Sequence, residues 1–432
     1  MSPVHPFLRD LHAGATPAFR DFVEALGGEI PLLADLHRTP QDPEWHGEGD
    51  VAAHTTLVLR EAYRLADTHA LGPDRRLALV LAALLHDLGK VLTTRRAEDD
   101  QGRGRVISPR HADRGRSFLA YRLPELGLPA SIVTAVMGLV GHHHDLGRAL
   151  TAGTAPAYRR LARQADLQLL VLLEQADIRG RVAADQASKL EDLDLFRLGA
   201  QEYGVWDSAD NADPYAAWRE VITRELAGFT PEYRDLVLGQ GILDYEAGLI
   251  QTPEEAVARG YAARAGFPQL VVTCGPSGAG KSSWVADQLP DFDVVSLDLL
   301  REELAGKRAD QSVNGRVLQE AKERLRISLR ARRRVVWDAT NTRRDFRGIP
   351  LRLGFDYGAL TTLVVFQPPL SSLFTRNPAR VHAVPAHVIA AQVENAEFPY
   401  ITEAHRTVTL DEFFRPSPAS PVLPGEKGEQ GL

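Results

Sequence analysis

The first two-thirds of the chain carry apolar residues at helical spacing. Segments such as GDVAAHTTLVLREAYRLADTHAL, DRRLALVLAALLHDLGK, ASIVTAVMGLVGHHH and AYRRLARQADLQLLVLLEQADIRGR repeat apolar positions every three or four residues, the period of an amphipathic helix. From about residue 267 the pattern changes to short β-rich runs, QLVVTC, DVVSLD, RRVVWDAT and LTTLVVF, separated by helical stretches. This alternation is typical of a parallel sheet with crossover helices. The sequence therefore predicts an all-α part followed by an α/β domain.

The two patterns divide the chain near residues 255–265. A chain of 432 residues is too long for one compact core, so we expect more than one domain. The last stretch, RPSPASPVLPGEKGEQGL, is polar and rich in proline and glycine, a composition typical of disorder. We expect an all-α domain over 1–185, a helical bridge over 186–265, an α/β domain over 266–414 and a disordered tail over 415–432.

Charge and composition restrict the class of protein. The formal net charge is −7, so any contact with nucleic acid has to be local. The one cysteine, Cys274, allows no internal disulfide and fits a reducing compartment. The sequence shows no secretory h-region and no apolar run near the ~20 residues that a membrane span needs. We expect a cytoplasmic protein with no membrane partner.

Ionisable side chains stand at the ends of the apolar helical segments. AALLHDLGKV is apolar up to His86 and Asp87, and Lys90 follows three residues later. Packing gives no reason for three ionisable groups at this place, whereas neutral imidazole and carboxylate suit divalent transition metals. Further residues of the same kinds occur at or near the ends of other segments, namely His54, His111, His142, His143, His144 and Asp177.

Each of these residues also has a structural interpretation. A histidine such as His54, taken alone, is more often a satisfied core or surface residue, and His46 fits an ordinary loop position. The triple histidine over 142–144 fits a solvated helix end, with only one or two members facing inward. The ordered set of His, His-Asp, His, His and Asp across successive helices favours a shared metal site over these alternatives.

The set HGEGDVAAHT…LLHDLGK…HADRG…HH…ADIRGR resembles the HD phosphohydrolase superfamily. More narrowly, it is similar to the HD domain of bacterial CCA-adding tRNA nucleotidyltransferases, over about residues 40–185. The resemblance implies 2′,3′-cyclic phosphodiesterase and phosphatase activity. It also implies metal ligation by His54, His86, Asp87 and Asp177, with His111 and His143 as ligands of a second metal or contacts to the scissile phosphate.

Two cations accompany the expected ligands. Lys90 lies on the face of Asp87 if the helix continues, where it can hold a phosphate or neutralise the leaving group. Arg181, four residues after Asp177, can do the same unless Gly180 ends the helix first. A nitrogen-rich site prefers Ni²⁺, Co²⁺, Cu²⁺ or Mn²⁺ to Mg²⁺. Such a metal lowers the pKa of bound water towards ~7 and polarises a phosphoryl oxygen.

The second domain opens with a phosphate-binding motif. VVTCGPSGAGKSS places G-x-x-x-x-G-K-S after a predicted strand and before a predicted helix, the context that a P-loop requires. Its glycines let backbone N–H groups turn towards phosphate oxygens. Lys281 is expected to reach the β- and γ-phosphates, and Ser282 to hold Mg²⁺. The expected ATP-binding residues are Gly275, Ser277, Gly278, Ala279, Gly280, Lys281, Ser282, Ser283 and Arg376.

Charged residues at the ends of the next strands extend this site. Asp298, three residues before Arg301, stands where a carboxylate can accept the proton of an attacking hydroxyl. A helix N-cap is the structural alternative for Asp298. Asp338, with Asn341 in WDATN, can orient Mg²⁺ through water or position the acceptor strand, and a loop cap is its alternative.

Two arginines in LFTRNPARVHAVPAHVI suggest a lid. Arg376 and Arg380 are four residues apart and can clamp the transferred phosphate, although a solvated face would give the same pattern. Together with Asp298 and DATN, they resemble the 5′-hydroxyl polynucleotide kinase branch of the P-loop phosphotransferases, over about residues 268–411. The resemblance implies Asp298, Lys281, Arg301, Arg376 and Arg380 as catalytic residues beside Asp87 and Lys90, and Asp338, Asn341, Arg301, Arg347 and Arg181 as contacts to nucleic acid.

An HD domain followed by this kinase is the layout of the bacterial HD-domain polynucleotide kinases, which are bifunctional RNA end-healing enzymes. The implied function joins removal of a 2′,3′-cyclic, 2′- or 3′-phosphate to phosphorylation of a 5′-hydroxyl on RNA or DNA, with ATP or another NTP and Mg²⁺. No ligase motif is visible, so a separate RNA ligase would act downstream. Two alternatives remain open: an HD nucleotidase fused to a nucleoside or sugar kinase, and an ATP-gated regulatory protein with a vestigial HD site.

Overall fold

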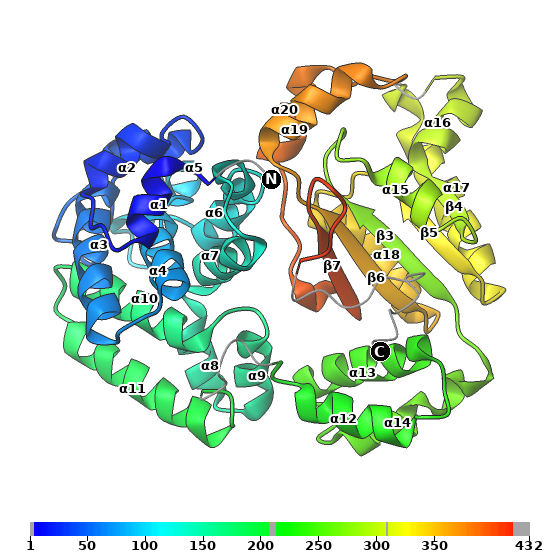
Figure 1. Cartoon of the computed structure of the whole chain (residues 1–432), viewed down its shortest axis with the longest axis horizontal. Helices are drawn as coiled ribbons and strands as arrows, with labels where there is room; N and C mark the ends of the chain where they lie inside the picture. The colour runs from blue at the N-terminus through cyan, green and yellow to red at the C-terminus, as the bar shows by residue number, and fades with distance from the viewer. Residues whose placement is uncertain (1–3, 207–212, 308–309, 418–432) are drawn as a thin grey trace. The chain divides into compact units, whose positions relative to one another are not determined.

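The computed structural model describes residues 4–206, 213–307 and 310–417. The chain forms two compact units, 1–214 and 215–432, which Figure 1 colours from blue to red along the sequence. The segment that we expected to bridge the domains, 186–265, is divided between these units. The expected tail lies outside the described residues from 418 onwards, so its disorder stays a prediction.

The first unit is helical, as its apolar pattern predicts. Helix α10 packs on α3 and α4, α4 packs on α3 and α7, and α6 packs on α7. Helix α4 is buried at every position from Arg76 to Leu85, which places its C-terminal end inside the unit. The helical elements are α1 Pro6–His12, α2 Phe19–Leu26, η1 Pro31–Arg38, α3 Val51–Thr68, α4 Pro73–Leu85, α5 Lys90–Thr93, α6 His111–Leu119, η2 Leu123–Leu126, α7 Ala130–His142, α8 Asp145–Ala152, α9 Ala155–Ala162, α10 Leu167–Gly180 and α11 Gln186–Glu202.

Two aspartates fix the starts of the helices that carry the N-terminal candidate residues. The Asp50 carboxylate accepts from the Ala53 N–H at 2.8 Å and caps α3. Asp166 accepts from the Leu169 N–H at 3.0 Å and caps α10. Side-chain caps of this kind satisfy N–H groups that the first helical turn leaves unpaired.

A two-stranded antiparallel hairpin interrupts the helical unit. Strand β1, Arg95–Glu98, pairs with β2, Gly104–Ile107. The periodicity does not predict it, because four-residue strands are too short to show a period of two. The hairpin lies between α5, which begins at Lys90, and α6, which begins at His111.

The second unit contains a five-stranded parallel sheet in the order β4-β5-β3-β6-β7. This confirms the expected α/β class, with one strand, β7, beyond the four that the β-rich runs predict. The strands are β3 Gln269–Cys274, β4 Asp293–Ser296, β5 Arg334–Asp338, β6 Leu360–Phe366 and β7 Arg406–Leu410. The helical elements after β3 are α15 Lys281–Gln288, α16 Leu297–Ala305, η5 Gln311–Val313, α17 Asn314–Arg330, α18 Arg344–Asp356, α19 Leu370–Arg376, η6 Asn377–Ala379, α20 Ala386–Glu394 and η7 Ile401–Glu403. Helices α17 and α18 pack on the sheet.

Three helices before the sheet belong to the same unit. Helices α12 Ala216–Glu225, α13 Pro231–Glu246 and α14 Pro253–Arg259, followed by η4 Gly260–Ala265, share one apolar core. Helix α13 contacts β6, and Arg406 at the start of β7 donates to Asp235 of α13 at 3.0 Å. In the described part of the chain, no helix has both the length and the apolar character to cross a bilayer.

Candidate active sites

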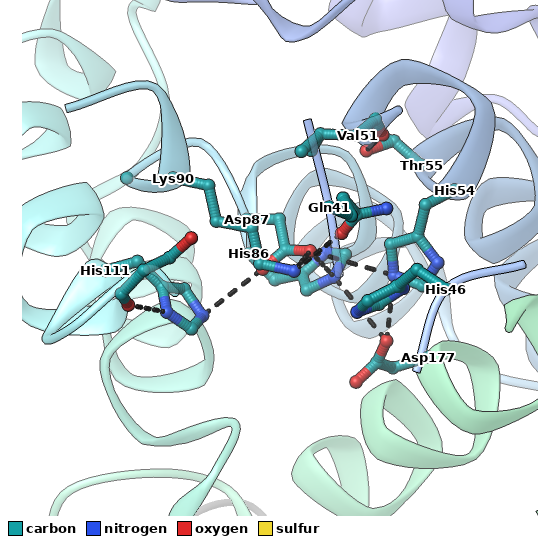
Figure 2. A network of polar contacts seen from close by, with 12 residues as sticks. Gln41, His46, Val51, His54, Thr55, His86, Asp87, Lys90, His111 and Asp177 are labelled. Carbon is teal, nitrogen blue, oxygen red and sulfur yellow. Dashed lines mark hydrogen bonds and ion pairs between the residues drawn. The ribbon is translucent and has the colours of Figure 1, made fainter. Parts of the chain in front are cut away.

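The helical unit gathers the expected metal ligands at one buried point (Figure 2). They come from α3, the turn after α4, and α10. His54 Nε2 lies 2.9 Å from Asp177 Oδ1 and 3.7 Å from Asp87 Oδ2. His86 Nε2 lies 3.3 Å from Asp87 Oδ2 and 3.8 Å from Asp177 Oδ1. All four side chains are at most 3% exposed, so three helical segments converge on a common centre.

The histidine rings are held so that Nε2 faces this centre. The Nδ1 atoms of His86, His111 and His143 donate to backbone carbonyls at 3.0, 2.9 and 2.8 Å. The carbonyls belong to Ala83, Ser108 and Val140, each three residues earlier in the chain. Because a carbonyl only accepts, these bonds place the proton on Nδ1 and leave Nε2 as the lone-pair nitrogen. Ligating histidines are oriented by this kind of outer hydrogen bond.

The donor atoms fit a divalent cation. His54 Nε2 and His86 Nε2 are buried and make no hydrogen bond with the described residues, although carboxylate oxygens lie within 4 Å. Buried polar atoms are rarely left unpaired. Their convergence on two carboxylates gives a set of two nitrogens and two oxygen-bearing groups, which suits a transition metal better than Mg²⁺.

A second group of histidines adjoins the first through Asp87. His111 Nε2 lies 3.2 Å from Asp87 Oδ1, 3.2 Å from His143 Nε2 and 3.1 Å from His144 Nε2. His142 instead turns to Asp145, with 2.7 Å between Nδ1 and Oδ2. Of the three consecutive histidines, His143 and His144 therefore face the site. The sequence could not assign them, because the last turn of α7 ends between His142 and His143.

Two cations hold the carboxylates in their charged form. Burial alone would raise the pKa of Asp87, but the Lys90 charge and contacts with His86 and His111 outweigh it and hold that pKa well below its usual value. Lys90 Nζ lies 2.7 Å from Asp87 Oδ2. Burial of Asp177 is likewise outweighed, chiefly by the Arg181 charge, so its pKa also lies well below normal. Arg181 pairs directly with Asp177. Both carboxylates are thus ionised, as ligands of a metal must be.

Lys90 and Arg181 reach the site differently from the sequence expectation. Helix α4 ends at Leu85, and a turn carries the chain to Lys90, the first residue of α5. The turn, rather than a continuous helix face, brings Lys90 to Asp87. Helix α10 ends at Gly180, and the extended Arg181 still folds back onto Asp177.

Sequence reasoning missed several polar groups around the centre. Glu48 Oε1 lies 2.9 Å from His54 Nδ1 and 2.7 Å from His46 Nδ1, while its Oε2 accepts from the Val182 N–H at 2.9 Å. Glu48 therefore orients His54 as carbonyls orient the other rings. In the sequence, the only signal for Glu48 is its place in the loop HGEGD directly before α3. Its contact with Val182 is long-range and cannot be predicted from that loop.

Gln41 and Glu174 complete the surroundings. Gln41 accepts from Lys90 Nζ at 2.7 Å, which places Lys90 between an amide and a carboxylate. Glu174 is buried, and burial together with the nearby Asp177 charge raises its pKa well above the usual value.

The α/β unit places the P-loop between β3 and α15, as expected. Gly278 and Gly280 adopt φ values of +89° and +91°, a left-handed conformation that favours glycine. Lys281 is buried, and its Nζ donates to the Pro276 carbonyl at 2.9 Å. Burial lowers the pKa of Lys281, whereas the charges of Asp338 and Asp298 act to raise it. Lys281 thus lies within electrostatic reach of both expected acidic groups.

Asp338 stands beside the P-loop serine. Ser282 Oγ donates to Asp338 Oδ2 at 2.7 Å, and Thr273 Oγ1 lies 3.3 Å from Asp338 Oδ1. A carboxylate paired with this serine can organise the coordination of Mg²⁺. This favours the metal-orienting interpretation of Asp338 over the contact to the acceptor strand.

Asp298 is not the cap of α16. The cap is Ser296, whose hydroxyl accepts from the Leu299 N–H. Asp298 lies in the first turn, is 64% exposed and forms an ion pair with Arg301 at 2.6 Å. The structure therefore removes the capping alternative and leaves the carboxylate exposed, within electrostatic reach of Lys281.

A cleft of about 360 Å³ extends from the P-loop. Its volume falls in the range of small-molecule sites. Arg376 and Arg380 line it together with the P-loop residues, so the two expected lid arginines do face the phosphate side. Arg376 also donates to the Glu412 carbonyl at 2.9 Å. The lining residues are Gly278, Gly280, Lys281, Ser282, Ser283, Arg376, Arg380, Glu412 and Phe414.

Two expected nucleic-acid contacts are structural residues instead. Arg347 is 1% exposed and forms a two-pronged ion pair with Glu403, at 2.6 and 2.9 Å. The Asn341 side chain is 5% exposed and donates to the Thr273 carbonyl at 2.8 Å. Both side chains are buried and used in contacts within the domain, since Arg347 joins α18 to η7 and Asn341 joins the segment after β5 to strand β3.

Comparison with known proteins agrees with this division. Residues 51–179 match the HD domain family and residues 270–399 match the AAA domain family. Curated relatives include the "Multifunctional CCA protein" of Xanthomonas campestris pv. campestris (strain B100), which is 28% identical over 205 residues, covering 46% of this chain and 44% of that protein. The protein of the same name from Alkalilimnicola ehrlichii is 29% identical over 177 residues, which is 39% of each chain. The one from Xylella fastidiosa (strain 9a5c) is 28% identical over 190 residues, which is 42% of each chain. The match thus spans less than half the length of these relatives. The chain combines an N-terminal HD domain with a C-terminal P-loop domain of the AAA type.

Proposed function

We propose that the protein is a bifunctional enzyme that heals nucleic-acid ends. Its HD domain would remove a 2′,3′-cyclic, 2′- or 3′-phosphate, and its P-loop domain would phosphorylate a 5′-hydroxyl with ATP or another NTP. The observation that carries the proposal is the presence, in one chain, of a buried His/Asp centre flanked by two cations and of a complete P-loop with an accessible carboxylate.

In the HD domain, His54, His86, Asp87 and Asp177 would hold a divalent transition metal. When bound, such a metal supplies Lewis acidity and lowers the pKa of water. Lys90, beside Asp87, is placed to bind a phosphate oxygen and neutralise developing charge. The Nδ1-to-carbonyl bonds fix the direction of Nε2 in His111 and His143, so these rings can contact a second cation or the scissile phosphate.

In the P-loop domain, the backbone N–H groups and Lys281 would bind the β- and γ-phosphates. Asp338 would keep Ser282 oriented towards Mg²⁺. The exposed Asp298 carboxylate would accept the proton of the attacking 5′-hydroxyl, oriented by Arg301. Arg376 and Arg380 would neutralise charge on the transferred phosphoryl group.

The pairing of the two activities makes chemical sense. Strand cleavage that leaves a 2′,3′-cyclic phosphate also leaves a 5′-hydroxyl, whereas a ligase joins a 3′-hydroxyl to a 5′-phosphate. The two domains would correct both ends of one break, and a separate RNA ligase would then seal it. The name of the relatives, Multifunctional CCA protein, supports a nucleic-acid end as substrate of the HD part. A cytoplasmic location would fit this role.

Incubation with a 5′-hydroxyl RNA and ATP labelled on the γ-phosphate tests the kinase, with 5′-hydroxyl DNA, nucleosides and sugars as competing acceptors. Hydrolysis of 2′,3′-cyclic AMP and of 3′-phosphorylated RNA, scanned over Ni²⁺, Co²⁺, Cu²⁺, Mn²⁺ and Mg²⁺, tests the HD domain. Transfer to a nucleoside or sugar alone would favour a fused small-molecule kinase. ATP binding without transfer or hydrolysis would favour a regulatory protein.

A further inference from the structure

The segment directly after β7 forms a tight turn beside the P-loop cleft. The Asp411 carboxylate accepts from the N–H groups of Phe413 and Arg415, at 2.8 and 2.9 Å, and its own N–H donates to the Arg415 carbonyl at 3.0 Å. Between them, Phe414 adopts a φ of +61°. A bulky residue in this left-handed region is an outlier that carries a conformational cost.

This strained backbone directs the Phe414 ring towards the P-loop. A Cβ built on Gly280 would lie only 2.6 Å from the ring, so the ring rests against the backbone of the phosphate-binding loop. The ring also meets the buried Phe366 edge-on, with centroids 6.1 Å apart. Phe414 is nevertheless only half-buried and forms part of the cleft wall.

An aromatic wall suits only one part of a nucleotide. Lys281, Arg376 and Arg380 supply the cationic lining that phosphates need, and Phe414 contributes nothing to it. Of the residues that line the cleft, Phe414 is the aromatic one. Aromatic side chains bind nucleobases by stacking, at about 1–3 kcal/mol per base.

The neighbours of Phe414 are committed to other contacts. The Glu412 carboxylate accepts from Ser372 Oγ at 2.7 Å, and the Glu412 carbonyl accepts from Arg376 at 2.9 Å. These bonds tie the turn to α19, which carries Arg376. These bonds hold the turn in place, and Phe414 contributes an aromatic ring without a hydrogen-bonding group to the cleft wall.

We propose that Phe414 is the platform on which the nucleobase of the phosphate donor stacks, while the P-loop holds the triphosphate of the same molecule. The inference rests on the kinase function proposed above. It divides the cleft into a phosphate subsite at Gly278–Ser282 and a nucleobase subsite at Phe414, with Arg376 beside both.

Inorganic tripolyphosphate separates the two subsites, because it carries the phosphates of ATP without a base. Titration calorimetry with Mg²⁺ would give the Kd of ATP and of tripolyphosphate for the full chain and for Phe414→Ala, Phe414→Leu and Phe414→Trp. Loss of stacking worth 1–3 kcal/mol per base corresponds to roughly a 5- to 150-fold rise in the Kd of ATP. We expect that rise in the Ala and Leu variants, near wild-type affinity in the Trp variant, and a Kd for tripolyphosphate within about twofold throughout.

The Leu variant is the control for folding, because it keeps an apolar group against Gly280 and Phe366 without an extended π-face. Thermal melts of each variant would show whether packing survives. Equal weakening of ATP and tripolyphosphate would make Phe414 a support of the P-loop and overturn the proposal, as would unchanged ATP affinity in folded Phe414→Leu. Wild-type protein that binds neither ligand would instead contradict the kinase function itself, and the base platform with it.

Discussion

At the scale of single residues, the His/Asp centre of the HD domain depends on how its histidine rings are oriented rather than on the residue types alone. Three histidines donate Nδ1 to a carbonyl three residues earlier, and His54 is paired with Glu48 on the same atom. Each ring is thereby turned with Nε2 inward before any cation arrives. A site organised in this way loses little freedom on binding a metal, and its nitrogen content sets which metal it prefers.

We expect the two activities to differ in the metal that they need. The HD centre offers imidazole nitrogens, which favour Ni²⁺, Co²⁺, Cu²⁺ or Mn²⁺, whereas phosphates and the Ser282 hydroxyl favour Mg²⁺. Metal-stripped protein supplied with Mg²⁺ alone should phosphorylate a 5′-hydroxyl RNA but hydrolyse 2′,3′-cyclic AMP poorly. Parallel assays after addition of each metal check this. Full hydrolysis with Mg²⁺ as the sole added ion would contradict it.

Asp298→Asn should lower kinase turnover by roughly 10²–10⁴, the usual contribution of a general base. The affinity for ATP should hardly change, because Lys281 and the loop backbone bind the phosphates. Stability should also hold, because Ser296 rather than Asp298 caps α16. Single-turnover phosphorylation at saturating ATP, with a thermal melt, measures both effects.

Lys281→Ala is the contrasting variant, since it should lose triphosphate affinity as well as rate. If the Asp298→Asn variant turned over as fast as the wild type, Asp298 would have no part in the chemistry. Its carboxylate would then be only a surface partner of Arg301.

At the scale of elements, the sequence predicts the helices and strands that show a periodic pattern or a local motif. It misses the features that depend on residues far away in the chain. The P-loop is a local motif, and its strand and helix follow from it. Strand β7, RTVTL, is short and half polar, and it becomes a strand because β6 offers a free edge. Arg347 resembles a substrate contact until its long-range pairing with Glu403 is seen. The role of Glu48 likewise depends on Val182, which lies far along the chain.

We expect His405, directly before β7, to make the second unit less stable in acid. His405 Nδ1 accepts the Thr361 N–H at 3.0 Å, and His405 Nε2 lies 3.0 Å from the Gln240 side-chain oxygen. Burial, reinforced by the Arg406 charge, lowers the pKa of His405 to about 3, against about 6.5 in the unfolded chain. Between pH 6.5 and 3 the unfolded state binds the extra proton, so stability falls as the pH drops through this window. At pH 5 the loss should reach about 2 kcal/mol.

His405→Asn is the matched control, because its side-chain oxygen can accept the same N–H but does not titrate. Thermal melts between pH 7 and pH 5 should show a smaller decline for this variant than for the wild type. Identical pH dependence in the two proteins would show that His405 does not carry the effect.

At the scale of the whole molecule, the two units hold separate cores and separate sites. Asp87 and its partners lie within 1–214, while the P-loop and its acidic residues lie within 215–432. The two reactions should therefore be separable by mutation.

Asp87→Ala should abolish phosphohydrolysis, because the centre loses a charged group that contacts Lys90, His86 and His111. Kinase activity on a 5′-hydroxyl RNA should stay near normal. Both assays on one folded preparation, judged by circular dichroism, check the prediction. Loss of both activities in folded Asp87→Ala would show that the sites are coupled.

The bond between Arg406 and Asp235 has a consequence for protein synthesis. The first unit has its whole core once residue 214 has left the ribosome. The second unit cannot complete its five-stranded sheet or form this bond to α13 until β7 has emerged, which at about 5–20 residues per second takes a further 10–40 s or so. Until then β6 keeps a free edge, because β7 is its outer neighbour in the sheet. A nascent chain would thus carry a finished helical unit ahead of an unfinished α/β unit, and the late segment is the part that chaperones would have to protect.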